Sequence, residues 1–249
     1  MAEPVLAARG LSKRFGGLAA VDGVSLALHA DRIHAVIGPN GAGKTTLVSL
    51  ISGELEPSAG SVMFEDLEIA GLPPARIARL GIARSYQRVN IFTGFSAHEN
   101  CRLAAQSRLG GGLRVLRLAR AERDLDAAAR HALRLVGLDP GGRATAGNLS
   151  HGEQRQLEIA MTLAISPKVL LLDEPLAGMG AAESARMTKL IKSLAKDRAI
   201  LLIEHDMDAV FSIADQLTVM VEGRVLETGK PGAIRKSRAV RKAYLGGAA

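Results

Sequence analysis

Cysteine and aromatic residues are scarce in this sequence, and each shortage argues against one class of protein. The single cysteine, Cys101, has no second cysteine with which to form an intramolecular disulfide, which favours a reducing compartment. Tryptophan is absent, and the chain has only two tyrosines and five phenylalanines. Proteins that stack nucleic-acid bases usually use many aromatic side chains, so the shortage argues against a base-stacking protein.

Long apolar runs are missing as well. No stretch approaches the roughly 18 to 20 apolar residues that a helix needs to cross a bilayer, and residues 1–15 lack the apolar core of a signal peptide. We therefore expect a soluble protein, or one held at a membrane by a partner. With 249 residues, 47% of them hydrophobic, the chain can bury a sizeable core, as one domain or as one domain with an inserted lobe.

The charge balance is basic, with a formal net charge of +7 and a pI near 9.9. Clustered lysine and arginine attract the phosphates of nucleic acids. They attract anionic lipid headgroups equally well, which would suit a protein at a membrane surface. The charge alone leaves both alternatives open.

The segment IGPNGAGKTTL, at residues 37–47, carries the most specific pattern in the chain. It matches G-x-x-x-x-G-K-[ST], the phosphate-loop pattern. The loop follows an apolar run at residues 33–37 and precedes a helical pattern at residues 46–51. We therefore predict the order strand, glycine loop, helix, which makes a chance match of the pattern improbable.

Phosphate binding explains why these residue types occur together. Gly38, Gly41 and Gly43 have no side chain to block an anion, so backbone N–H groups can turn inward, and the helix N-terminus adds its positive dipole end. Lys44 is expected to meet the β- and γ-phosphates, and the Thr45 hydroxyl to hold Mg²⁺. The sequence thus predicts a nucleotide-phosphate site.

The remaining pattern indicates an α/β protein. Residues 5–36 alternate short β-like runs around the turn Gly16-Gly17, which predicts an antiparallel edge. Phe15, just before that turn, could stack on adenine or be an ordinary half-buried aromatic residue. From residue 95 to 148 the apolar spacing becomes helical, with a glycine-rich loop at 110–112 that we expect to be mobile. Uniformly apolar strands at 168–173 and 199–203, separated by an amphipathic helix, then predict a parallel sheet covered on both faces.

Polar residues follow the apolar strands where ligands bind in open α/β sheets. Asp173 and Glu174 end one strand, and we expect Asp173 to hold Mg²⁺ through water and Glu174 to polarise the attacking water. His205 closes the next strand and Gln87 closes the earlier segment GIARSYQ, so both should reach the same edge. Two solvated acids and a structural histidine are the simpler alternatives.

Ser150 and Glu153, in NLSHGEQRQLEIA, form an S-x-x-E capping box before an amphipathic helix. Ser150 could therefore merely start a helix. The same exposed helix N-terminus is also an anion site, so the two interpretations are compatible.

Together, IGPNGAGKTT, Gln87, LSHGE, LLLDEP and His205 resemble the ATP-binding subunit of an ATP-binding cassette (ABC) transporter over essentially the whole chain. LSHGE discriminates this family from other phosphate-loop proteins. The resemblance implies a P-loop NTPase fold of the ABC ATPase type, with an antiparallel β subdomain and an inserted helical subdomain. Within one ABC domain, residues 1–249, it implies a nucleotide-binding core at 1–94 and 152–229, a helical subdomain with the signature at 95–151, and a basic tail at 230–249.

The resemblance also assigns roles to residues, with ATP and Mg²⁺ as the bound groups. Phe15 would stack on adenine, and Gly38, Pro39, Asn40, Gly41, Ala42, Gly43, Lys44, Thr45 and Thr46 would bind the phosphates. Lys44, Gln87, Glu174 and His205 would be catalytic, and Thr45, Gln87 and Asp173 would hold the metal. Ser150, His151 and Gly152 would reach the ATP held by an opposite subunit.

Within the family, the motifs look most like the ATPases of branched-chain amino-acid importers. His151 stands where glycine is commonest, Glu153 where glutamine is, and Met179 where the loop after LLLDEP often has aspartate. The resemblance implies a cytoplasmic protein, peripheral on the inner face of the cell membrane. Its partners would be a second ABC ATPase, identical or related, integral membrane permease subunits, and indirectly a periplasmic solute-binding protein.

Three alternatives remain open. The chain could energise another ABC system, such as import of a different solute or lipid export. It could be a soluble ABC ATPase that acts on nucleic acid, although we expect no nucleic-acid partner because tandem cassettes and long coiled coils are absent. A small-molecule kinase would use the phosphate loop but neither LSHGE nor His205.

The basic tail at 230–249 could contact lipid, pack as a regulatory helix, or be a solvated face.

Overall fold

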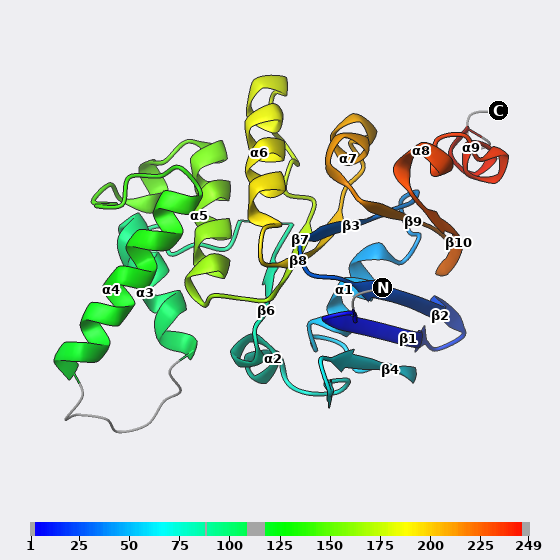
Figure 1. Ribbon diagram of the computed structural model, residues 1–249, viewed down its shortest axis with the longest axis horizontal. Helices are drawn as coiled ribbons and strands as arrows, with labels where there is room; N and C mark the ends of the chain where they lie inside the picture. Colours follow the sequence, from blue (N-terminus) through cyan, green and yellow to red (C-terminus); the bar gives the residue numbers. More distant parts are fainter. Residues whose placement is uncertain (1–2, 88, 109–117, 246–249) are drawn as a thin grey trace.

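The computed structural model describes residues 3–87, 89–108 and 118–245, and Figure 1 shows how they are arranged. The strands of these residues form a four-stranded sheet in the order β2-β1-β4-β5 and a six-stranded sheet in the order β10-β9-β3-β8-β7-β6. The bounds of the first sheet are β1 Leu6–Phe15, β2 Leu18–Leu28, β4 Ala59–Phe64 and β5 Leu67–Glu68. Those of the second are β3 Arg32–Ile37, β6 Ile82–Ser85, β7 Val169–Asp173, β8 Ala199–Ile203, β9 Gln216–Val221 and β10 Arg224–Gly229.

The six-stranded sheet is parallel from β6 to β9, and β10 closes it as an antiparallel hairpin strand. The hairpin turn falls at Glu222-Gly223, where both residues have positive φ, as tight hairpin turns require. Strands β7 and β8 consist of buried residues throughout. Such strands require cover on both faces of the sheet, as the apolar runs predicted.

Helices and the antiparallel sheet supply that cover on opposite faces. The antiparallel sheet and α1 pack on one face, around Val36 and Leu171. Helices α5, α6 and α7 pack on the other, around Ala35 and Leu172, and α3 and α4 pack against α5 (Figure 1). The helices are α1 Lys44–Ile51, α2 Pro74–Leu80, α3 Ala97–Arg108, α4 Leu118–Leu135, α5 His151–Ala164, α6 Ala181–Leu194, α7 Met207–Ile213, α8 Pro231–Ile234 and α9 Arg238–Leu245, with a 3₁₀ turn at Ala146–Asn148.

The α/β fold with an antiparallel sheet and an inserted helical group is confirmed, while some element ends differ from the expectation. Strand β6 ends at Ser85 and not at Gln87, because side chains of α5 occupy the backbone groups of the next residues. Likewise α1 begins at Lys44 and not at residue 46. His205 lies two residues beyond the end of β8. The glycine-rich loop expected at 110–112 lies outside the described residues.

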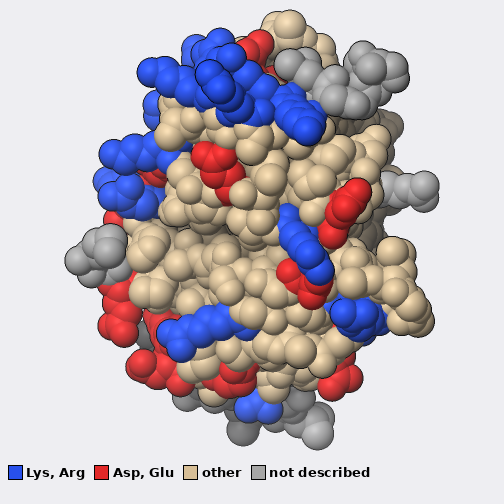
Figure 2. Space-filling model, turned by 90° about the vertical axis from the view of Figure 1, so that its right-hand side faces the viewer, with Lys and Arg blue, Asp and Glu red and all other residues tan. Residues whose placement is uncertain are grey.

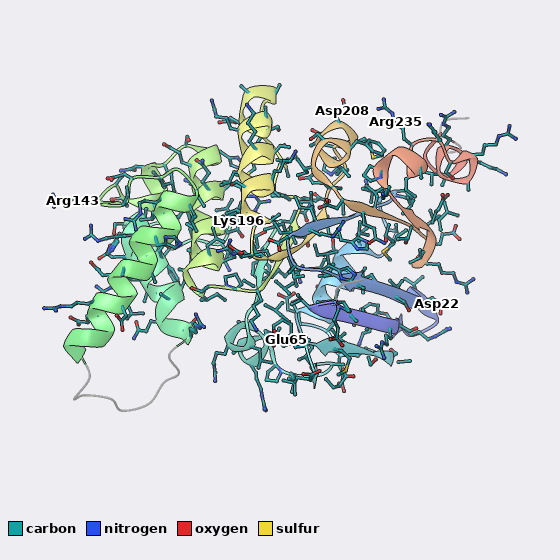
Figure 3. The ribbon with its side chains drawn as sticks, in the orientation of Figure 1. Asp22, Glu65, Arg143, Lys196, Asp208 and Arg235 are labelled. Atoms are coloured by element: carbon teal, nitrogen blue, oxygen red, sulfur yellow. The ribbon has the colours of Figure 1, made fainter. Side chains whose placement is uncertain are left out.

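Charged side chains are unevenly distributed over the surface. Lysine and arginine gather over α8 and α9, at the top of Figure 2, where Arg235, Lys236, Arg238, Arg241 and Lys242 are exposed. Figure 3 shows Arg235 on the same side as Asp208, whereas Arg143 lies at the far end with the helical group. Among the described residues, no helix combines the length and apolar character that crossing a membrane would need.

Candidate functional site

The phosphate loop wraps the start of α1 at the carboxyl end of β3. Gly38 must be glycine, because a Cβ there would lie 2.2 Å from the backbone oxygen of Met220. Gly43 has φ 93°, and a Cβ would lie 2.2 Å from the backbone oxygen of Ala20. The loop lines a cavity of about 760 Å³, large enough for a nucleotide's phosphates, together with Gln87 and Glu174.

Lys44 already lies inside this loop. Its Nζ donates to the backbone oxygens of Gly38, at 2.8 Å, and of Pro39, at 3.0 Å. Burial lowers the pKa of Lys44, while the carboxylates of Glu174 and Asp173 act in the opposite direction. An anion bound in the loop would therefore meet a cation that is held in place and only partly balanced by acids.

The structure brings Glu174, Gln87 and His205 together at the edge of the sheet. Gln87 Nε2 donates to Glu174 Oε2 at 2.8 Å, and His205 Nδ1 lies 3.8 Å from Glu174 Oε1. The three residues come from the ends of β6, β7 and β8, which are neighbours in the sheet. Glu174 itself has φ 50°, a left-handed conformation that costs a residue with a Cβ roughly 1 to 2 kcal/mol. Such strain is retained where surrounding contacts hold it, and it is common at functional sites.

Asp173 is buried beside the loop. Its Oδ2 accepts from Arg84 Nη2 at 3.0 Å, whereas its buried Oδ1 has no hydrogen-bond partner among the described residues. Burial raises the pKa of this carboxyl group, and Arg84 counteracts the rise. A buried carboxylate oxygen without a donor fits a cation or its bound water, and Thr45 supplies a hydroxyl in the adjoining cavity. This donor set is compatible with Mg²⁺.

The LSHGE motif begins α5 as a complete capping box. Glu153 accepts from the Ser150 backbone N–H at 2.9 Å and from the Ser150 hydroxyl at 2.8 Å, while the Glu153 backbone N–H donates back to Ser150 Oγ. These hydrogen bonds lower the pKa of Glu153. Ser150 and Gly152 line a separate cavity of about 260 Å³, which also contains Met179 and does not include the phosphate loop.

Two expected contributors lie away from the phosphate cavity. Phe15 is 48% exposed, next to Lys13, and the cavity wall comes instead from Leu18 to Ala20 on the other side of the same turn. The His205 side chain is 64% exposed, and the ion pair it forms within the described part of the chain is with Glu174. His151 lies near Gly178, where a Cβ would be 3.4 Å from its ring. The roles of these residues stay predictions.

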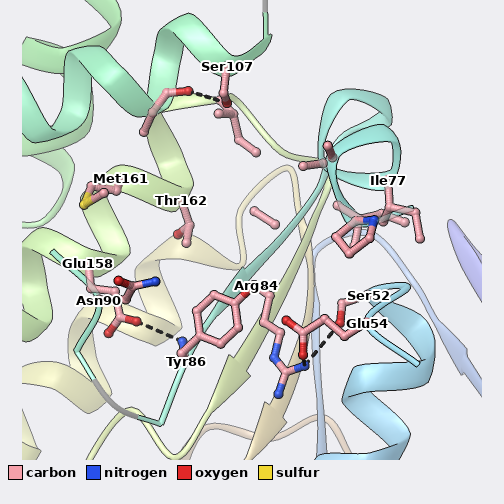
Figure 4. A pocket seen from close by; sticks show the side chains of 17 residues that line it. Ser52, Glu54, Ile77, Arg84, Tyr86, Asn90, Ser107, Glu158, Met161 and Thr162 are labelled. Carbon is pink, nitrogen blue, oxygen red and sulfur yellow. Dashed lines mark hydrogen bonds and ion pairs between the residues drawn. The ribbon is translucent and has the colours of Figure 1, made fainter. Parts of the chain in front are cut away.

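A groove lies between α2, β6, α3 and α5, next to the segment that follows Gln87. It has a volume of about 330 Å³, and Tyr86, Asn90 and Met161 contribute to its lining (Figure 4). Close by in the chain, Phe92 and Phe95 stack with ring centroids 5.6 Å apart while remaining 54% and 44% exposed. Exposed aromatic side chains beside a groove are typical of a protein interface.

Sequence reasoning missed the buried charges that support these residues. Arg84 joins Asp173 to Glu54, and Arg155 reaches the backbone of both the Gln87 and Glu174 segments. Glu204 accepts from the backbone N–H groups of Leu176 and His205. The only sequence signal was a charged residue at the end of an apolar strand or within an amphipathic helix, which normally indicates a solvated face.

Comparisons of the sequence and of the structure with known proteins all indicate the same family. A family model described as "ABC transporter" matches residues 21–177. The chain is 41% identical over 254 aligned residues to the branched-chain amino acid transport ATP-binding protein BraF of Pseudomonas aeruginosa, and 40% identical to LivG of Escherichia coli K12, with 99% of each chain covered. It also resembles a nucleotide-free ATP-binding cassette from an ABC transporter, with a TM-score of 0.85 and 27% identity, over 97% of this chain and 99% of that one.

A second solved structure, the ADP conformation of an ATP-binding cassette of an ABC transporter, gives the same TM-score of 0.85 and 27% identity. It covers 98% of this chain and 100% of that chain. Because both matches extend over nearly all of each chain, the similarity includes the antiparallel sheet, the parallel sheet and the helical group.

Proposed function

This chain belongs to the ABC transporter family, and on that premise we propose that it is the ATP-hydrolysing subunit of an importer for branched-chain or related amino acids. The observation that carries the proposal is the hydrogen bond between Gln87 and Glu174, which both line the cavity of the phosphate loop, with His205 Nδ1 3.8 Å from the other carboxylate oxygen of Glu174. The amino-acid substrate is supported by the similarity to BraF and LivG over the full length of the chain.

The phosphate loop would hold ATP. Residues 38–46 offer backbone N–H groups and the Lys44 ammonium to the phosphates, and Phe15 would approach adenine only after moving toward the cavity. Thr45, Gln87 and Asp173 would hold Mg²⁺, which neutralises charge on the phosphates when bound. Lys44 Nζ already lies inside the loop, where it donates to the backbone oxygens of Gly38 and Pro39, and phosphate oxygens would replace these acceptors.

Glu174 would act as the general base for the attacking water. Its carboxylate lines the cavity and is within hydrogen-bond distance of Gln87, so a water between the loop and Glu174 would meet an acceptor. His205 would contact the γ-phosphate from the neighbouring strand. Gln87 would release Glu174 when it turns to the metal, which would make the base available only after nucleotide binds.

A second subunit would complete the site, either another copy of this chain or a relative. The support is that Ser150, His151 and Gly152 belong to a different cavity from the phosphate loop of the same chain. Only a facing subunit could bring a signature helix N-terminus to the bound ATP. ATP contacted from both sides would stabilise the closed pair, and hydrolysis would remove that stabilisation.

A membrane permease would dock in the groove of Figure 4 and on the exposed rings of Phe92 and Phe95, which follow in the chain the groove residue Asn90. Tyr86, the residue before Gln87, lines the groove, so a change at Gln87 on nucleotide binding would alter the surface to which the permease binds. The protein would therefore lie on the inner face of the cell membrane, and a periplasmic binding protein would act through the permease. We propose the subdomain bounds 1–94 with 152–229, 95–151, and 230–249 on the same basis.

Substitution of the base tests this function. Purified protein should hydrolyse ATP slowly, and Glu174→Gln should lower kcat by roughly 10² to 10⁴-fold, as expected for loss of a general base. ATP affinity should be retained, because the phosphate loop is unchanged. Phosphate release and equilibrium ATP binding are the two measurements, and an active Glu174→Gln protein would remove the assigned base.

The importer assignment needs the membrane partners. The complex isolated from membranes and reconstituted in vesicles should release phosphate faster when a branched-chain amino acid and its binding protein are supplied outside. The Glu174→Gln complex, with its much lower kcat, is the control for background phosphate release. Acceleration by a chemically different solute would support the ATPase assignment but show that the transported substrate is not a branched-chain amino acid. Acceleration by DNA or RNA, and by no solute, would contradict the importer.

A further inference from the structure

Arg155 and Glu158 form the most deeply buried ion pair among the described residues. They lie three residues apart on α5, with Arg155 Nη1 2.7 Å from Glu158 Oε2, and their side chains are 2% and 4% exposed. Arg155 is the largest fully buried side chain among the described residues. Burying two charges is costly unless their remaining hydrogen-bonding groups are satisfied.

The partners are backbone groups of the two segments that carry Gln87 and Glu174. Arg155 donates to the backbone oxygens of Tyr86 and Gln87 on one side, the latter at 3.2 Å. On the other side it donates to the backbone oxygens of Glu174, at 2.7 Å, and Pro175, at 3.4 Å. Glu158 Oε1 accepts from the Tyr86 backbone N–H at 2.9 Å, as Figure 4 shows.

Glu174 depends on this arrangement because its backbone is strained. Its φ of 50° is unfavourable for a residue with a Cβ. The Glu174 backbone N–H donates to Ile203 at 2.9 Å, and its carbonyl accepts from Arg155. Both ends of the strained peptide are thereby fixed, which determines where the carboxylate points.

The same helix carries the signature serine. Ser150 is the N-cap of α5, and Arg155 lies in the second turn. The guanidinium therefore connects three elements through one rigid planar group with several donors, which lysine cannot reproduce. A simple core ion pair would not need carbonyl acceptors from two separate segments.

We propose that Arg155, supported by Glu158, is a positioning residue that aligns Gln87 and Glu174 for ATP hydrolysis and couples them to the signature helix. The inference rests on the proposed function. Arg155 contacts no substrate. It acts through the backbone of the Gln87 and Glu174 segments, so its loss should slow the chemical step more than it weakens nucleotide binding.

The test compares Arg155→Lys with the wild-type protein. Lysine keeps the charge opposite Glu158 but cannot span both segments, so we expect kcat to fall by roughly 10 to 100-fold, the order expected for misplacing a catalytic group by about 1 Å. The dissociation constant for ATP should stay within about twofold, because the phosphate loop lies outside these contacts. Arg134→Lys, an exposed arginine of α4, is the matched control and should change neither value.

A double-mutant cycle separates positioning from a purely structural role. If Arg155 acts through the Gln87 segment, Arg155→Lys should lower kcat at least about threefold less in a Gln87→Ala background than in the wild type, since residues of one network are non-additive. Glu158→Gln, which keeps the shape of the acceptor, should show a smaller loss in the same direction. Thermal unfolding of every variant verifies that each is folded at the assay temperature.

Four outcomes overturn the inference. An unchanged kcat in Arg155→Lys would show that the hydrogen bonds do not align the site. A parallel loss of ATP affinity and kcat, or effects of Arg155→Lys and Gln87→Ala that simply multiply, would assign Arg155 a structural role alone. A folded wild-type protein without ATPase activity would overturn the proposed function as well, whereas an active wild type beside a fully active Arg155→Lys removes only this inference.

Discussion

The phosphate loop and the acid junction meet at one cavity but are built in opposite ways. The acid junction is defined here as Arg84, Gln87, Arg155, Asp173 and Glu174. The phosphate loop is one contiguous segment whose chemistry comes from backbone N–H groups, glycines and one lysine. The acid junction combines residues from three segments, and buried arginines hold it together.

The two regions should therefore be sensitive to different kinds of substitution. The loop cannot accept an added Cβ at Gly38 or Gly43, where another segment of backbone approaches closely. In the junction, the geometry depends on long side chains that pair with buried acids, and removing one partner leaves a buried charge without compensation. Stability should therefore be most sensitive to an arginine far along the chain from the loop.

Arg84→Met should give the largest effect. Arg84 lies 3.0 Å from Asp173 and 2.8 Å from Glu54, and its Nη1 also donates to the Ser49 hydroxyl at 2.9 Å. The Arg84 and Asp173 side chains are only 7% and 2% exposed, so we expect the free energy of unfolding to fall by about 3 to 5 kcal/mol. Denaturant-induced unfolding measures this loss.

The control for that prediction is Arg79→Met, a nearby arginine whose side chain is exposed on α2. Its substitution should change the free energy of unfolding by less than about 0.5 kcal/mol. Equal losses in the two variants would mean that the buried pair contributes no more than an exposed side chain. The proposed dependence of the acid junction on buried arginines would then be wrong.

Gly38→Ala tests the loop side, with an intermediate effect. The new Cβ would lie 2.2 Å from the Met220 oxygen, so the loop must shift or β9 must yield. Overpacking of this kind costs about 1 to 3 kcal/mol, and the displaced loop should also bind ATP more weakly. Unfolding and equilibrium ATP binding are measured together.

Gly17→Ala provides the matched glycine, because its added Cβ would meet open space and its φ is not positive. It should leave both stability and ATP affinity nearly unchanged. If Gly38→Ala behaved in the same way, the close approach between the loop and β9 would not constrain the phosphate site.

The same contrast explains what sequence could predict. The loop was predictable because its determinants, two spaced glycines, a lysine and a following helix, are contiguous. The meeting of Gln87, Glu174 and His205 was also predictable, since adjacent parallel strands end at one edge of a sheet.

The junction's supports were not predictable, for a physical reason. Arg155 and Glu158 are spaced like a solvated helical ion pair, and only the packing of α5 against β6 and the acid segment buries them. The same contacts ended β6 two residues early, since Tyr86 gives its backbone N–H to Glu158 and its carbonyl to Arg155. A local pattern contains no information about such long-range partners.

The smallest predicted effect on stability comes from His34. It tests whether the strand that leads to the phosphate loop is destabilised at low pH. The ring lies on β3, buried, with Nδ1 3.2 Å from the Ala27 oxygen and Nε2 2.8 Å from the Thr218 hydroxyl. Burial lowers the pKa of His34 below its ordinary value of 6.5. The unfolded chain therefore takes up this proton first as pH falls, so stability decreases below about pH 6.5.

One histidine can contribute at most about 1.4 kcal/mol per pH unit, so the measurement is the difference in unfolding free energy between wild type and His34→Gln from pH 8 to pH 5. The wild type should lose more stability on acidification, because glutamine at this position does not titrate. His131→Gln, in which an exposed histidine of α4 is replaced, should parallel the wild type. If the unfolding free energies of all three proteins changed with pH in parallel, the strand leading to the phosphate loop would accommodate the protonated ring. The phosphate loop would then depend less on the buried residues beneath it than the acid junction does.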